Sequence, residues 1–192
     1  MNPSSDPIVV VDYDPTWPAL FAALRAPVAA ALGDLAVAVE HVGSTAVPGL
    51  AAKPVVDMDV AIPSASALDA AIERLASLCY VHKGDQGILG RAAFDWPPHV
   101  RRHHLYVCAH DNAEYRRHLL FRDYLHAHPD VVAAYTALKR HLAARYRTQR
   151  ETYTDAKGPF IGDVLARAEE WARAIGWTAA DSNDLIRGMI KP

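Results

Sequence analysis

The sequence predicts an α+β fold, with a strand-rich body in residues 1–111 and a C-terminal helical region in residues 112–192. Before residue 112, short apolar segments typical of strands alternate with amphipathic helices, whereas beyond it apolar residues recur only at helical spacing. A chain of 192 residues suits one domain, or one domain with a helical extension. We therefore expect a mixed β-sheet flanked by helices, with the helical region packed on it in one structural unit.

The elements follow from hydrophobic spacing and from the positions of Gly and Pro. A helix is expected over residues 15–32, kinked at Pro27, and a buried strand over residues 35–42. Residues 43–53 form a loop rich in Gly and Pro. The further expected elements are a strand over 54–62, a helix over 65–78, strands within 79–83, 87–96 and 103–109, and helices over 113–127, 130–148 and 159–175.

Composition excludes several classes of protein. Twenty Lys and Arg against twenty-two Asp and Glu do not indicate a general nucleic-acid binder. No apolar run approaches the roughly 18–20 residues of a membrane span, and the N-terminus does not resemble a signal peptide. Two Cys residues cannot build a disulfide framework. We expect a cytoplasmic protein without a membrane partner.

Charge is nevertheless segregated along the chain. Residues 1–60 hold two basic and seven acidic side chains, whereas residues 101–150 hold ten basic and four acidic ones. Eight of the ten His residues lie between His99 and His141. We expect the functional site where the acidic and the basic parts meet.

The most informative segment is Val55-Val56-Asp57-Met58-Asp59-Val60. Because side chains alternate along a strand, Asp57 and Asp59 point to the same face, where two carboxylates repel each other and lose hydration. A divalent cation such as Mg²⁺ resolves this conflict, because it takes carboxylate oxygens and keeps substrate phosphates as further ligands. The alternative is a solvent-facing edge strand with two inert Asp residues.

A turn precedes this strand and strengthens the hypothesis. Gly43-Ser44-Thr45 follows the strand that ends near Val42, and a Gly there permits a tight turn and close approach of the backbone to a ligand. Backbone N–H groups of the turn and the Ser44 hydroxyl are suited to phosphate oxygens. Taken alone the turn favours no function. Neither the P-loop motif nor G-x-G-x-x-G occurs in the chain.

At this point the sequence resembles a known family. HVGSTAVPGLAAKPVVDMDV (residues 41–60) is similar to the GrpB family, a branch of the DNA polymerase β-like nucleotidyltransferase superfamily. The similarity extends over about residues 8–170 and includes WPALF (17–21), HHLYV (103–107), RRHLLFRDYLHAHP (116–129) and YTDAKGPFI (153–161). It implies a small mixed sheet, a nucleotide held at Ser44, and Asp57 and Asp59 as metal ligands.

The resemblance also implies a third carboxylate on a later strand, and this sequence departs from that pattern. The corresponding segment, His103-His104-Leu105-Tyr106-Val107, has no acidic residue. Strand alternation places His104 opposite the core-facing Leu105, so His104 is the candidate third ligand or general base. A site with His favours Mn²⁺ or another transition metal over Mg²⁺. The alternative is that both His residues are ordinary strand-end residues.

Basic residues supply candidates for phosphate binding. We single out Lys53, just before the acidic strand, Lys157 in the YTDAKGPF segment, and Arg102, because arginines bind phosphate oxygens in bidentate fashion. The loop around Lys157 is expected either to cover the nucleotide or acceptor pocket or to be a helix-capping linker. For most of the Arg residues near the last strand, a solvated helix face is the simpler interpretation.

The resulting hypothesis is a metal-dependent nucleotidyltransferase that moves a nucleotidyl group from a nucleoside triphosphate to a small-molecule acceptor, with an RNA acceptor ranked below it. Asp57, Asp59 and His104 would be catalytic, and Gly43, Ser44 and Thr45 would bind phosphate. One alternative is a catalytically inactive nucleotide-binding or interaction module. Another is a metal-dependent phosphohydrolase that uses the His-rich strand.

Overall fold

The computed structural model describes residues 6–180 and 182, and the chain divides into two compact units. The sheet unit consists of Asp14–Ala46 and Val55–His118, and the helical unit of Met1–Tyr13, Val47–Pro54 and Leu119–Pro192. The division does not fall at a single position near residue 111, because the chain passes between the units at residues 13–14, 46–47, 54–55 and 118–119.

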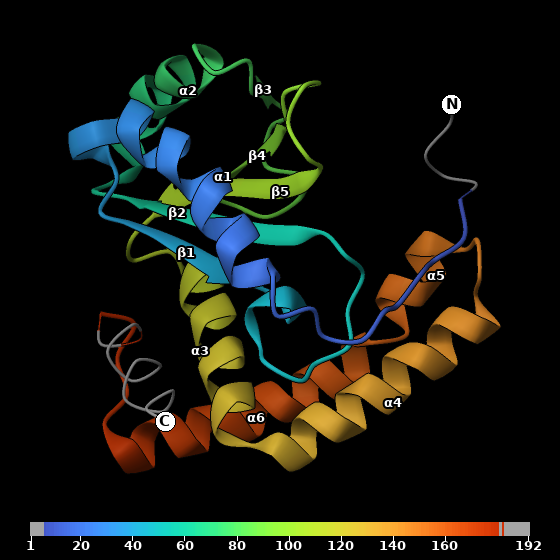
Figure 1. The fold of residues 1–192 in the computed structure, drawn as a ribbon. Coiled ribbons are helices and arrows are strands. Elements are labelled where there is room, and N and C mark those ends of the chain that lie inside the picture. The colour runs from blue at the N-terminus through green and yellow to red at the C-terminus, as the bar shows by residue number, and fades with distance from the viewer. Residues whose placement is uncertain (1–5, 181, 183–192) are drawn as a thin grey trace. The chain divides into compact units, whose positions relative to one another are not determined.

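The sheet unit is built on a five-stranded mixed sheet, as the sequence predicts (Figure 1). β2 and β5 are parallel, and the other neighbouring strands are antiparallel. In spatial order the strands are β1 (Ala38–Val42), β2 (Val56–Ile62), β5 (His103–Ala109), β4 (Arg91–Asp95) and β3 (Val81–His82).

One face of this sheet carries the hydrophobic core. Helices α1 (Trp17–Leu32) and α2 (Leu68–Ala76) lie against it (Figure 1). The core side chains of β2 are Val56, Met58, Val60 and Ile62, which alternate along the strand. The same alternation leaves Asp57 and Asp59 on the opposite face of the sheet, as the sequence predicts.

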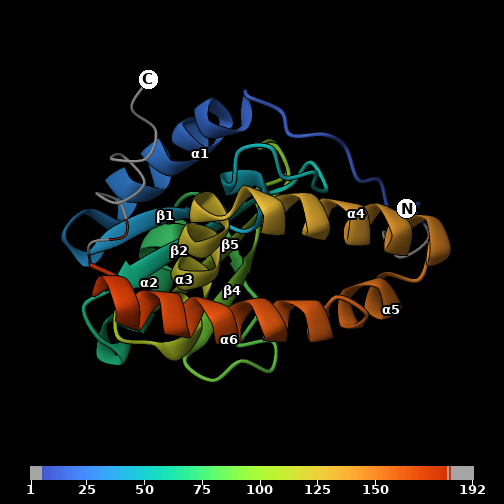
Figure 2. The same ribbon diagram turned by 90° about the horizontal axis from the view of Figure 1, so that it is seen from below.

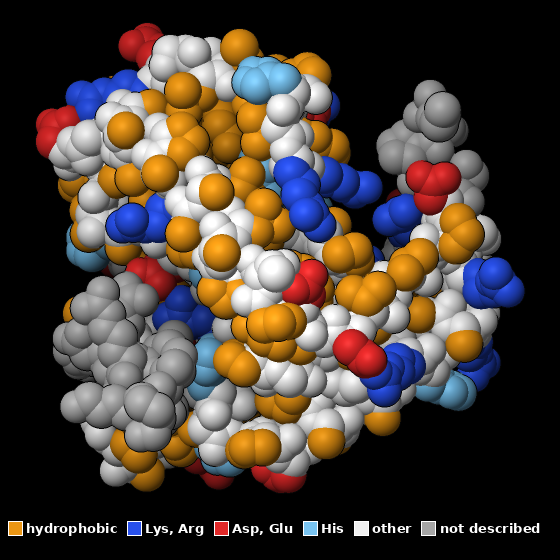
Figure 3. All heavy atoms as spheres, viewed as in Figure 1, with side chains coloured by type: hydrophobic (Ala, Val, Ile, Leu, Met, Phe, Trp, Pro, Cys, Tyr) orange, Lys and Arg blue, Asp and Glu red, His pale blue; other side chains and the backbone are white. Residues whose placement is uncertain are grey.

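Helix α1 bears on the expectation that no apolar run approaches the length of a membrane span. The segment 17–35, which is α1 and the turn after it, is long and apolar enough to cross a membrane by length and composition, with a mean hydropathy of 1.3. In the structure, Leu24, Val28 and Leu32 are buried in the core of the sheet unit. The exposed positions of the helix are mainly Ala and Pro, which accounts for the apolar surface seen over α1 in Figure 3.

Several elements are shorter than predicted. The first strand begins at Ala38 rather than residue 35, because Gly33–Leu35 forms a 3₁₀ turn. The second helix begins at Leu68, after another 3₁₀ turn at Ala65–Ala67. β3 and β4 are also shorter than predicted. Gly84, Gly87 and Gly90 have positive φ and hold the segment between the two strands in turns.

The helical unit contains the end of α3 (Ala113–Ala127), which begins in the sheet unit, and α4 (Pro129–Arg145), α5 (Arg150–Asp155) and α6 (Gly158–Ile175). In Figure 2, α5 lies at the turn between α4 and α6. Tyr135 of α4 stacks on Phe160 of α6 at 5.0 Å between ring centroids. Hydrophobic spacing in the sequence predicts α3, α4 and α6, but a loop is expected where α5 forms.

The two short segments of the helical unit are tied to its helices and to each other. Val11 and Ala52 exchange backbone hydrogen bonds of 2.9 Å in both directions. The N–H of Ile8 donates to the carbonyl of Arg147, and the N–H of Ala51 donates to the Thr136 hydroxyl. These bonds satisfy the backbone of segments that belong to no strand of the sheet.

Candidate functional site

The glycine turn lies directly against the first acidic residue. Val42, at the end of β1, pairs with Asp57 in the antiparallel register, and Gly43 follows with φ +69°. A Cβ atom added at Gly43 would lie 2.2 Å from Asp57 Oδ2, far inside van der Waals contact. Only glycine fits, because the backbone needs a left-handed conformation and has no space for a side chain.

Asp57 and His104 form an acid–imidazole pair at a partly exposed position. The parallel register of β2 and β5 places them side by side. His104 Nδ1 lies 2.5 Å from Asp57 Oδ1, and the side chains are 34% and 29% exposed. A carboxylate that holds an imidazole in this way fixes the tautomer and orientation of the ring, as a general base requires.

Asp59 is buried and faces a second imidazole that the sequence analysis did not single out. His118 of α3 places Nδ1 2.6 Å from Asp59 Oδ2 and Nε2 3.2 Å from Glu114 Oε1. Both ring nitrogens can donate only in the imidazolium form. Burial by itself favours a lower pKa for His118, but the hydrogen bonds to the two carboxylates and their charges outweigh it and raise the pKa to about 10.

The pKa values of the two carboxyl groups that contact His118 are shifted in opposite directions. The hydrogen bond from His118 lowers the pKa of Glu114 to about 2, against the effect of burial. Burial raises the pKa of the Asp59 carboxyl, and the imidazolium opposes that shift. Asp59 Oδ1 is buried and has no hydrogen-bond partner among the described residues. An unmatched carboxylate oxygen at the centre of the site is costly unless a ligand supplies its partner.

A third carboxylate shares this face, although not on the strand where the resemblance implies it. Glu40 of β1 is directly opposite Asp59 in the antiparallel register and is 4% exposed. Directly paired residues project from the same face of a sheet. The signal was present in the sequence, because alternation from the core residue Val39 already turns Glu40 toward the acidic face.

An arginine also belongs to this face. Arg91 of β4 is paired with Cys108 of β5, which lies on the same side of the sheet as His104. Its guanidinium lies over the Tyr106 ring, 4.3 Å from the centroid. Arg91 falls inside an expected strand, but nothing in its sequence context marks it as facing the carboxylates.

The donor chemistry of the acidic face suits a divalent cation. Mg²⁺ is commonly held by one or two carboxylates and completed by phosphate oxygens and water. Asp57 and Asp59 provide such carboxylates, and Asp59 Oδ1 is the oxygen without a partner. Within residues 6–180 and 182, no group of three His, Cys, Asp or Glu side chains is arranged to hold a metal ion by itself. A cation at this position would therefore depend on ligands from a substrate.

The turn itself is held from the core side. Ser44–Ala46 forms a 3₁₀ turn. The Thr45 hydroxyl lies 2.9 Å from His41 Nε2, and His41 stacks on Phe21 of α1 with ring centroids 4.6 Å apart. Thr45 is only 1% exposed, so it positions the turn from within and does not offer its hydroxyl to solvent.

The predicted basic residues are distributed between the units. In the sheet unit, Arg102 lies over the Trp96 ring at 5.2 Å, and Trp96 packs against the core that α1 and α2 cover. In the helical unit, Lys53 and Lys157 lie 5.7 Å and 4.7 Å from the centroid of the Tyr153 ring. The two lysines are thus brought together, and their role in phosphate binding stays a prediction.

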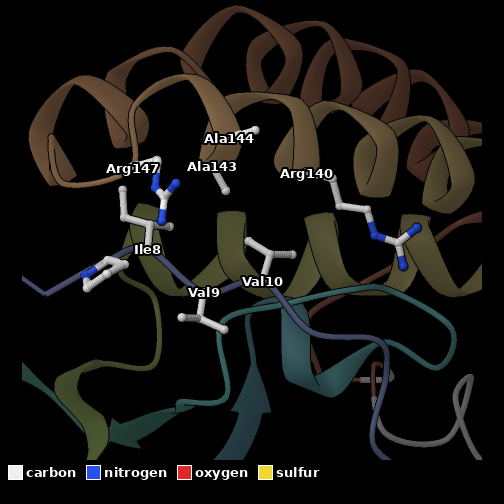
Figure 4. Close-up of a pocket in the computed structure, with 8 residues that line it drawn as sticks. Ile8, Val9, Val10, Arg140, Ala143, Ala144 and Arg147 are labelled. Carbon is white, nitrogen blue, oxygen red and sulfur yellow. The ribbon is translucent and has the colours of Figure 1, made fainter.

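Two cavities of the helical unit are lined by apolar and by basic or imidazole side chains. One, of about 410 Å³, lies between the N-terminal segment and α4, and its lining includes Arg140 and Arg147, the latter beside Ile8 (Figure 4). Arg140 is ion-paired with Asp12. The other, of about 580 Å³, is formed by residues 48–49 and by side chains of α3 and α4 that include His126.

Comparison with known proteins gives one consistent family. The family described as GrpB protein matches residues 7–167. A UPF0157 protein of Pseudomonas aeruginosa is 39% identical over 171 residues, covering 87% of this chain and 70% of that protein. UPF0157 protein YqkA of Bacillus subtilis is 32% identical over 86% of this chain, but the chain spans only 48% of its length.

A solved structure agrees with this result. The crystal structure of the conserved protein GrpB from Enterococcus faecalis is similar with a TM-score of 0.77 and 32% sequence identity. The similarity covers 85% of this chain and 99% of that one. From the extent of the family match, the shared fold and the GST turn against the acidic strand, the chain belongs to the GrpB family.

Proposed function

We propose that this protein is a metal-dependent nucleotidyltransferase that transfers a nucleotidyl group from a nucleoside triphosphate to a small-molecule acceptor. The observation that carries the proposal is the contact between the Gly43 turn and Asp57, on a face that also holds Asp59. A phosphate-binding turn and a cation-binding carboxylate must lie this close if they are to hold the same triphosphate.

Each residue has a defined task in the proposed reaction. Asp57 and Asp59 would hold Mg²⁺ or Mn²⁺, and this cation, when bound, neutralises charge on the phosphate oxygens. The backbone N–H groups at Gly43 and Ser44, with the Ser44 hydroxyl, would orient the phosphates. His104, held by Asp57 at 2.5 Å, would accept the proton of the attacking acceptor group.

Kinase activity is not part of this proposal. Proteins named dephospho-CoA kinase from Mycolicibacterium paratuberculosis and from Mycobacterium leprae are 31% and 29% identical to this chain, which spans 48% of their length. Their name is related to nucleotide chemistry, which supports a nucleotide ligand in general. The P-loop motif is missing from this sequence, so the name alone does not extend phosphoryl transfer from ATP to it.

A second candidate is a module that binds nucleotides without turnover. The observation in its favour is the His118 imidazolium between Asp59 and Glu114, because it already compensates carboxylate charge on the acidic face. In addition, β5 carries no carboxylate beside β2, so the third carboxylate that the resemblance implies for catalysis is missing from this strand.

One experiment separates these functions. The protein is incubated with labelled nucleoside triphosphates, Mg²⁺ or Mn²⁺ and a pool of metabolites that includes phosphate monoesters, and triphosphate binding and the release of pyrophosphate and of free phosphate are measured. The variant Asp57→Asn removes the charge with little change in shape, and Asp69→Asn, an exposed carboxylate on α2, is the matched control.

Pyrophosphate release that is lost in Asp57→Asn but kept in Asp69→Asn supports transferase activity. Binding without release at any acceptor supports the module instead. Free phosphate released from phosphate monoesters identifies a phosphohydrolase. If no triphosphate binds with either cation, the proposed function is refuted.

A further inference from the structure

Arg91 is placed on the acidic face by strand register. β4 and β5 are antiparallel with Arg91 opposite Cys108, and β5 and β2 are parallel with Tyr106 opposite Asp59. Since side chains two residues apart share a face, Arg91, Cys108, Tyr106 and Asp59 all project from the same side of the sheet. A guanidinium therefore lies on the face of the sheet that carries the carboxylates.

The Arg91 side chain is held in place, but not all of its N–H groups have a hydrogen-bond acceptor. Its guanidinium lies 4.3 Å from the centroid of the Tyr106 ring, a cation–π geometry that restrains the group. One terminal nitrogen reaches the carbonyl of Asp85 at 3.4 Å. Its Nε is buried and has no hydrogen-bond partner among the residues that the structure describes. A buried guanidinium nitrogen without an acceptor is unusual, because such groups are normally satisfied.

The charge of Arg91 acts on several groups of this face. Burial raises the pKa of Tyr106 and of Cys108 to about 12, and Arg91 opposes the shift at both. It also opposes the shift that burial causes at Asp59. Arg91 is therefore within electrostatic reach of the carboxylate that the proposed function assigns to cation binding.

We propose that Arg91 binds phosphate oxygens of the triphosphate, and this inference rests on the proposed function. An oxyanion beside Asp59 would give the Arg91 Nε the acceptor that it lacks, and a planar guanidinium can hold two oxygens at once. The ring of Tyr106 acts as the platform that fixes the guanidinium, so Tyr106 is a positioning residue.

Arg91 and Arg102, the arginine that the sequence favours for phosphate binding, stack on aromatic rings on different sides of the sheet. Arg102 stacks on Trp96, whose side chain packs against the core on the face covered by α1 and α2. Arg91 stacks on Tyr106, on the face of the carboxylates. The two arginines have similar aromatic supports on different sides of the sheet, which makes them a natural pair for comparison.

The test measures the affinity of the full chain for Mg²⁺–ATP and for Mg²⁺–tripolyphosphate by calorimetry, together with urea unfolding of each variant. Arg91→Lys keeps the positive charge but loses the bidentate fork. We expect both ligands to bind roughly tenfold to hundredfold more weakly, as for loss of hydrogen bonds to a charged group. Arg74→Lys on α2, where the arginine is ion-paired with Asp34, is the matched control and should bind like the wild type.

The outcomes separate this inference from the proposed function. If the wild type binds neither ligand, both fail. If the wild type binds them and Arg91→Lys binds equally well, only the inference fails, and a loss of stability alone assigns Arg91 a structural role. If Arg102→Lys binds the two ligands more weakly while Arg91→Lys binds them like the wild type, Arg102 is the residue that binds the phosphates.

A second variant keeps the test decisive if Arg91→Lys does not fold. Tyr106→Leu retains the arginine but removes the ring beneath it. We expect a smaller loss of tripolyphosphate affinity, about threefold to tenfold, because the guanidinium stays present but is no longer fixed. Unchanged affinity in a folded Tyr106→Leu protein overturns the role of the ring and of the arginine that it holds.

Discussion

Substitution of Gly43 by Ala tests the close approach on which the candidate site depends. At φ +69° an alanine costs about 1–2 kcal/mol relative to glycine. Its Cβ would lie 2.2 Å from Asp57 Oδ2 and 2.9 Å from Asp57 Cγ, so the carboxylate must move away. Moving it breaks the hydrogen bond to His104, which at this partly exposed position contributes about 1 kcal/mol. We expect Gly43→Ala to lower the free energy of unfolding by about 2–3 kcal/mol.

Gly84→Ala is the matched control in the same unit. Gly84 has φ +75°, close to that of Gly43, but an added Cβ would meet nothing within 4 Å. This variant has the same backbone strain and the same effect on the unfolded chain, without the clash. The difference between the two variants therefore isolates the clash with Asp57, and we expect it to be about 1 kcal/mol or more.

Urea unfolding followed by circular dichroism gives both free energies, and triphosphate binding is measured on the same samples. Gly43→Ala should also lose binding, whereas Gly84→Ala should keep it. Equal destabilisation of the two variants, within about 0.3 kcal/mol, contradicts the close approach of the turn to Asp57. Relief of the clash by a second substitution, Asp57→Ala, provides an internal check, because only the Asp57 Cβ, at 3.1 Å, would then stay near.

Three further predictions concern buried or half-buried polar groups, each measured by urea unfolding. His118 has a pKa of about 10 against an ordinary 6.5, so its imidazolium stabilises the fold fully below pH 6.5. The free energy of unfolding should therefore fall by on the order of 3 kcal/mol more in the wild type than in His118→Gln as the pH rises from 6.5 to 10, and parallel pH profiles contradict this. Tyr80→Phe removes the 2.7 Å hydrogen bond to the buried His103 and should cost about 1–3 kcal/mol; a cost near zero shows that the bond is not formed. Asp123→Ala removes the carboxylate 2.8 Å from the buried Arg122 and should cost about 3–5 kcal/mol, and a cost below 1 kcal/mol argues against this buried pair.

The order and type of the main elements could be predicted because each has a local cause. Alternation in Val56, Met58 and Val60 marks β2 as a strand with one apolar face, and the structure confirms it. The ends of elements were less predictable. Residues 35–37 are as apolar as β1, but the 3₁₀ turn at Gly33–Leu35 delays the strand until Ala38.

Helix α5 shows a different limit. Its six residues, Arg150–Asp155, are too few to show hydrophobic periodicity, and the helix depends on tertiary contacts such as the burial of Tyr153.

For the candidate site, alternation within a strand was sufficient for Asp57 and Asp59, and it also turns Glu40 and His104 toward the same face, but it did not select Arg91 or His118. His104 could be named because it lies on a recognisable strand. Arg91 and His118 reach the same face through strand register and through a helix that follows β5, and both are long-range facts. Neither is encoded in local spacing, so a single sequence gives no reason to select them.

The way the chain passes between the units has a consequence for biosynthesis. The sheet unit needs no residue after His118, so all of its strands can pair while the ribosome is still translating the C-terminal third. Ile8, by contrast, is synthesised early, but its N–H donates to the carbonyl of Arg147, which is translated much later. The segment around Ile8 must therefore wait, exposed, until α4 has emerged. A nascent chain stalled near residue 160, with His118 outside the ribosome and Arg147 still inside it, should therefore be protected from proteases over its sheet and remain cleavable near its N-terminus.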